Sequence, residues 1–117
     1  MILEKKDILE DWLLVRDFVE RITEKKNADT NAVLFLIGVQ EVGKGKKTYS
    51  KEQKQDLIHV GTCAVLCLSG YYSFSHLDAD GWPHFQLVKK LPHGKIGEQE
   101  LFLKSNIVNY FKHHELI

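Results

Sequence analysis

The chain has 117 residues, of which 44% are hydrophobic and 10% aromatic; this predicts a folded single domain, 1–117, and excludes a disordered chain. Lys and Arg together number 16, as do Asp and Glu, so the net charge is zero and no strong field would draw the protein to nucleic acid or to an anionic membrane. The longest apolar run is far shorter than a membrane span, and the N-terminus lacks the pattern of a secretory signal. We therefore expect a cytoplasmic protein that binds neither nucleic acid nor a membrane.

A first helix is predicted from Asp7 to about Lys26. Apolar residues recur there at steps of three and four, which is the spacing of one helix face. The members of this stripe are Ile8, Trp12, Val15, Val19 and Ile22.

The next segment, 31–42, is apolar on all sides, so its pattern fits either a buried helix or a buried strand. Its length favours a helix, which Gly43 would end. The end of this segment and the residues after it place Gly38, Gly43 and Lys44 at the spacing of a phosphate-binding loop. That motif requires a hydroxyl residue after the lysine, and this chain has Gly45 there, so we interpret Gly43 as a helix stop.

Ser50 and Gln53 have the spacing of a capping box, which predicts the start of a third helix. This helix, 51–68, is expected to be the central one, because its second half is apolar all round.

An alternating pattern follows at 71–88, with turn residues at 78–81, and predicts a β-hairpin. A last helix is predicted from about Gly97 to His114. The expected fold is therefore mainly α, with about four helices around helix 51–68 and a short hairpin near 71–88.

One face of helix 51–68 carries a series of side chains that can bind metals. Asp56, His59 and Cys63 fall on this face, and Glu41 on the preceding helix is a possible fourth ligand. Such residues suit zinc or another divalent metal, which predicts a metal-dependent enzyme or sensor. The alternative is structural: Cys63 is a small core residue, and His59 hydrogen-bonds to Asp56 or to a nearby carbonyl.

The predicted hairpin is rich in aromatic residues. Tyr72, Phe74, Trp82 and His84 are the candidates for an interaction surface, since aromatic side chains with polar groups are frequent at interfaces. The alternative is that the hairpin covers a small core. No nucleophile with a neighbouring base can be assigned, so the sequence favours a non-catalytic module that binds itself or another protein over an enzyme.

Three segments carry a resemblance to a known family. These are VLFLIGVQEVGKG at 33–45, KQDLIH at 54–59 and DGWPH at 80–84. Together they resemble a family of small uncharacterised bacterial proteins, over roughly residues 30–111. The resemblance implies a bacterial, cytoplasmic setting, and it supplies no reaction and no catalytic residues.

Overall fold

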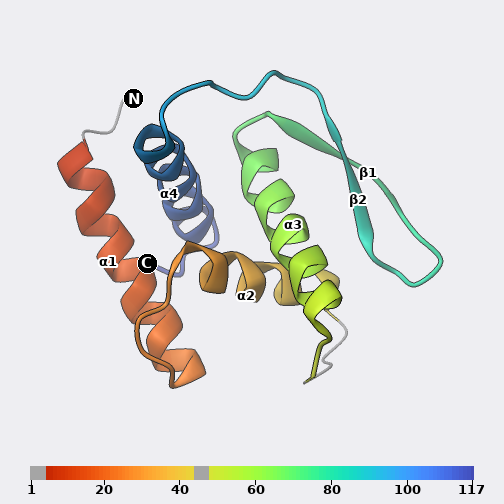
Figure 1. The fold of residues 1–117 in the computed structure, drawn as a ribbon, viewed down its shortest axis with the longest axis horizontal. Helices are drawn as coiled ribbons and strands as arrows, with labels where there is room; N and C mark the ends of the chain where they lie inside the picture. Colours follow the sequence, from red (N-terminus) through yellow and green to blue (C-terminus); the bar gives the residue numbers. More distant parts are fainter. Residues whose placement is uncertain (1–4, 44–47) are drawn as a thin grey trace. The chain divides into compact units, whose positions relative to one another are not determined.

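The computed structural model describes residues 5–43 and 48–117, which form four helices and one two-stranded antiparallel hairpin (Figure 1). The elements in chain order are α1 (Lys5–Thr23), α2 (Thr30–Val42), α3 (Lys51–Leu68), β1 (Tyr72–Leu77), β2 (Pro83–Leu87) and α4 (Ile96–His113). This confirms the predicted mainly α fold with a short hairpin. None of the described helices is both long and apolar enough to cross a membrane.

Backbone contacts divide the chain into two compact units. The terminal unit combines the residues up to Thr30 with Leu91–Ile117, and so contains α1 and α4. The central unit is the continuous stretch Asn31–Lys90, which holds α3, the hairpin and all but the first residue of α2. The single domain arranged around helix 51–68 stays a prediction.

In the terminal unit, α1 packs along α4. The apolar stripe of α1 is buried at Ile8, Trp12, Val15 and Val19, and α4 buries Ile107, Val108 and Phe111. The rings of Phe18 and Phe111 meet edge to face, with their centroids 5.7 Å apart. At the surface, Nζ of Lys112 lies 2.7 Å from Oδ2 of Asp11, which joins the two helices by an ion pair.

The first helix ends earlier than the sequence predicted. It stops at Thr23 because Glu24 and Asn27 have positive φ angles of 58° and 62°, a left-handed conformation that breaks the helical run. The predicted end at Lys26 is therefore wrong. Ile22, in the last turn, is 56% exposed, so its assignment to the buried stripe is also wrong.

The ambiguous segment in the central unit is a helix. α2 buries Val33, Leu34 and Ile37, and it ends where the N–H of Gly43 donates to the carbonyl oxygen of Val39 over 2.9 Å. Gly43 has a φ of 67°, which glycine adopts without strain, so its predicted role as the helix stop is confirmed. The lysine and glycine that follow it in the near phosphate-loop motif lie outside the described residues.

Two glycines allow α2 and α3 to cross at backbone contact. A Cβ atom added to Gly38 would overlap the carbonyl oxygen of Leu57, and one added to Gly61 would overlap that of Leu34. Neither position has room for a side chain. The crossing therefore depends on glycine in both helices.

The start of α3 follows the predicted capping box. The Ser50 hydroxyl accepts the N–H of Gln53 over 3.1 Å, and the Gln53 side chain accepts the N–H of Ser50 over 2.9 Å. These bonds satisfy backbone donors that the first turn of a helix leaves unpaired.

The hairpin pairs β1 with β2 and packs against α3. Phe74 lies opposite Phe85, but the next pair is His76 with His84, because the register shifts by one residue between Phe74 and His76. This irregularity places the two histidine rings in a parallel stack with centroids 4.8 Å apart. The turn closes where Gly81 donates its N–H to the carbonyl oxygen of Asp78 over 2.9 Å.

Candidate functional site

A pocket of about 310 Å³ lies between α3 and the hairpin, within the central unit. It is lined by Asp56, His59, Val60, Asp78, Trp82, Pro83, His84 and Phe85. Four of the side chains that the sequence analysis singled out therefore meet here. Asp56 and His59 come from the predicted metal site, and Trp82 and His84 come from the predicted interaction surface.

Asp78 organises the rim of this pocket. Its Oδ1 accepts the backbone N–H groups of Asp80 and Trp82 over 2.9 and 3.0 Å, and its Oδ2 lies 2.9 Å from Nε2 of His84. The hydrogen bond from His84, with those from the two backbone N–H groups, lowers the pKa of Asp78, and these effects outweigh the partial burial of the carboxylate. The sequence assigns Asp78 only to the turn at 78–81, and the one local signal for its contact with His84 is their spacing of six residues.

The predicted metal-binding face of α3 provides one close pair of donors. Sγ of Cys63 lies 3.6 Å from Nε2 of His59, one helical turn away. Burial raises the pKa of Cys63 to about 11, with a smaller contribution from Cys67, so the group is a neutral thiol. The negative charge of Glu41 affects Cys67. Burial is the larger cause of the raised pKa of Cys67, and the Glu41 carboxylate raises it further.

Among residues 5–43 and 48–117, no three His, Cys, Asp or Glu side chains come close enough together to hold a metal ion. The set of Asp56, His59, Cys63 and Glu41 therefore stays a prediction from sequence. Elemental analysis of the purified protein is the measurement that tests it.

The predicted interaction surface is divided by the packing of the hairpin. Tyr72 and Trp82 are half-buried, and burial, followed by the neighbouring Cys63, raises the pKa of the Tyr72 hydroxyl. Phe74 and His84 are exposed. Four apolar side chains on or next to the two strands are exposed, and we call this set the hairpin patch: Phe74, Leu77, Leu87 and Val88.

No protein-family model, curated protein or solved structure matches this chain. The resemblance to small bacterial proteins stays a prediction. The function is therefore argued from the geometry of the described residues, since a fold alone does not define an activity.

Proposed function

We propose that this protein is a non-catalytic self-association module in which β1 pairs with β1 of a second copy. The observation that carries the proposal is the hairpin patch beside an uncharged strand. The side chains of Phe74 and Leu77 are 56% and 60% exposed, on a strand that contains neither a charged residue nor a proline.

The edges of the hairpin support this proposal. In the part of the chain that the structure describes, the sheet has two strands, so each strand keeps one edge whose N–H and C=O groups have no strand partner. Proteins usually protect such edges with lysine, proline or a bulge. β2 begins at Pro83 and is followed closely by Lys89 and Lys90, whereas β1 has only the register shift after Phe74. β1 is therefore the less protected edge.

A second copy fits this edge better than a charged partner would. β1 carries no charge, so antiparallel pairing with its own copy brings no like charges together, and the whole chain has a net charge of zero. Antiparallel pairing of identical strands also satisfies two-fold symmetry, which is the commonest symmetry of homodimers. The product would be a four-stranded sheet, and sheets of three or more strands are more stable than a hairpin.

Sedimentation velocity over a range of protein concentrations tests the proposal. We expect a monomer–dimer equilibrium that Phe74→Lys shifts toward monomer, raising the dissociation constant by about tenfold or more, because the variant replaces an apolar side chain near the middle of the strand with a charged one and brings two like charges to the same interface. Leu13→Lys is the matched control. Leu13 is also apolar and is 58% exposed, but it lies on α1 in the terminal unit.

Monomer at every concentration would overturn the proposal, and so would a dimer that Phe74→Lys leaves intact. A dimer that only Leu13→Lys disrupts would assign the interface to α1. We chose Phe74 over Tyr72 and Trp82 because those two side chains are half-buried, so their replacement would also weaken the hairpin itself.

A further inference from the structure

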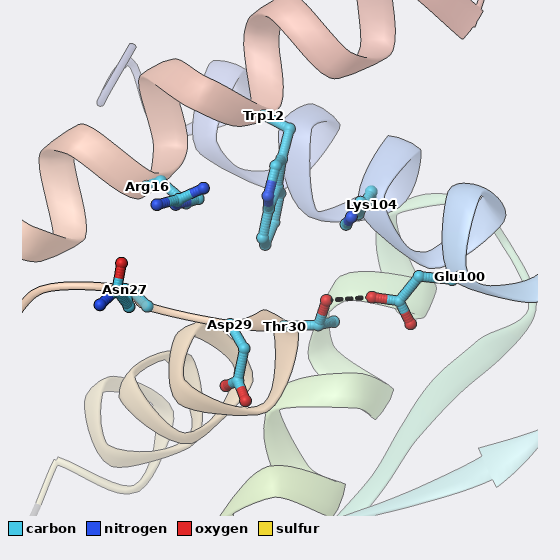
Figure 2. A pocket seen from close by; sticks show the side chains of 8 residues that line it. Trp12, Arg16, Asn27, Asp29, Thr30, Glu100 and Lys104 are labelled. Atoms are coloured by element: carbon cyan, nitrogen blue, oxygen red, sulfur yellow. Dashed lines mark hydrogen bonds between the residues drawn. The ribbon is translucent and has the colours of Figure 1, made fainter. Parts of the chain in front are cut away.

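A second pocket, of about 290 Å³, lies within the terminal unit (Figure 2). It is lined by Trp12, Arg16, Asn27, Ala28, Asp29, Thr30, Glu100 and Lys104. Ligand pockets in proteins generally span about 300–1,000 Å³, so this one suits a small molecule.

The charges of the lining are separated onto two sides. Figure 2 shows the Trp12 ring extending from α1 into the pocket, with Arg16 on one side of it and Lys104 on the other. Glu100 and Thr30 lie across the pocket from this group, whereas the side chain of Asp29 points away from Trp12. One wall is therefore positive around an aromatic ring, and the facing wall is negative.

The positive wall is held in place before any ligand arrives. Nη2 of Arg16 lies 3.6 Å from Oε2 of Glu20, and the same carboxylate oxygen accepts the N–H of Ala28 over 3.2 Å. The backbone hydrogen bond from Ala28 is the main reason that the pKa of Glu20 is lowered, so Glu20 remains a carboxylate. The ammonium of Lys104 lies 5.3 Å from the centroid of the Trp12 ring, in a cation–π contact.

The Arg16 guanidinium has unused hydrogen-bonding capacity. Its ion pair with Glu20, at 3.6 Å, is longer than a hydrogen bond. Its buried Nε is a donor with no acceptor among the described residues. Buried donors of this kind are rare in native proteins and call for a partner such as water or a ligand.

The negative wall and the loop beside it are also fixed. The Thr30 hydroxyl donates to Oε1 of Glu100, which orients that carboxylate. The loop between α1 and Thr30 contains the left-handed residues Glu24 and Asn27. Non-glycine residues in this conformation cost about 1 kcal/mol or more and are concentrated at ligand sites.

We propose that this pocket binds a free amino acid or a zwitterion of similar size. The ligand carboxylate would lie toward Arg16 and Lys104, its ammonium toward Glu100, and its carbon skeleton against Trp12. A simple anion would be opposed by the Glu100 carboxylate, and a simple cation would be opposed by the two basic groups. Only a molecule that carries both charges is complementary to both walls.

Tryptophan fluorescence tests this inference directly. The chain has two tryptophans, so Trp82→Phe leaves Trp12 as the only reporter. We would titrate this variant with glycine, leucine and phenylalanine, each compared with its N-acetyl acid and its primary amide. These derivatives keep only the negative or only the positive charge, so the comparison needs no change at the pocket.

We expect at least one free amino acid to change the Trp12 emission saturably, and both of its derivatives to bind about tenfold more weakly or worse. Lys104→Gln should weaken binding by a similar factor. Lys89→Gln is the matched control, because Lys89 also lies over an aromatic ring, that of Tyr71, but in the central unit.

Three results would overturn the inference. The first is the absence of a saturable response to any free amino acid. The second is an N-acetyl acid that binds as tightly as its parent, which would define a simple anion site. The third is an amide that binds as tightly, which would define a simple cation site. Circular dichroism of the Lys104 variant separates lost binding from lost folding.

Discussion

Replacement of Gly61 by alanine tests the close crossing of α2 and α3. The new Cβ would overlap the carbonyl oxygen of Leu34 and would lie 3.0 Å from its carbonyl carbon and 3.1 Å from the backbone nitrogen of Gly38. Favourable contacts between carbon atoms are at about 3.5–4.0 Å, and the overlap with the carbonyl oxygen is more severe than either of these two contacts, so the helices would have to separate by about 1 Å or more. The obstacle is backbone, which cannot rotate aside as a side chain can.

Two opposing effects determine the magnitude. Forcing extra volume into a packed site costs about 1–3 kcal/mol, and occasionally more. Alanine in a helix interior is favoured over glycine by about 1 kcal/mol. Because the clash at Gly61 is with backbone, we take the upper part of the first range and expect a net loss of about 2 kcal/mol in the free energy of unfolding.

Urea unfolding followed by circular dichroism measures this loss. Gly97→Ala is the matched control, because Gly97 lies in α4 and a Cβ there would meet no atom within 4 Å. Its free energy of unfolding should stay within about 0.5 kcal/mol of the wild-type value or rise slightly. A Gly61→Ala variant as stable as the wild type would refute the reasoning about the crossing.

Two further predictions concern ionisable groups. Asp78→Asn should destabilise the hairpin at neutral pH. Because the pKa of Asp78 is lowered in the folded protein, its carboxylate contributes stability above about pH 4. This contribution is lost as the pH falls through the lowered pKa. The difference in urea midpoint between wild type and variant should therefore shrink in acid, and a constant difference would contradict this. In a Cys67→Ser variant at about pH 8, iodoacetamide should alkylate Cys63 at least about tenfold more slowly in the native protein than in urea. Burial, which is the main cause of the raised pKa of Cys63, remains in this variant and lowers the thiolate fraction, although the smaller contribution of Cys67 is lost. Equal rates would contradict the assigned burial.

Local signals in the sequence were sufficient for most of the helices and the hairpin. The capping box of Ser50 and Gln53 involves groups three residues apart, so its spacing alone located the start of α3. The stop at Gly43 was likewise recognisable from one residue and the length of the run before it. The end of α1 was not recognisable, because no sequence pattern required Glu24 to adopt a left-handed conformation.

Features that join distant residues were missed. The pocket around Trp12 depends on Glu100 and Lys104 from the other end of the chain, and no local pattern relates these positions. Gly61 did carry a signal, since an isolated glycine inside a helix commonly has a packing reason, but its partner Leu34 could not be inferred. The register shift after Phe74 was also missed. It places His76 opposite His84, which an unbroken alternation of the two strands would not do.

The pairing of α1 with α4 has a consequence for synthesis on the ribosome. The central unit can assemble once residues up to about Lys90 have emerged, but α1 must wait for α4, which is made last among the described elements. At about 5–20 residues per second, its apolar stripe stays without its partner helix for several seconds. The ion pair between Asp11 and Lys112 thus closes only after α4 has been made. Until then, the apolar stripe of α1 lacks the surface of α4 that covers it in the folded terminal unit.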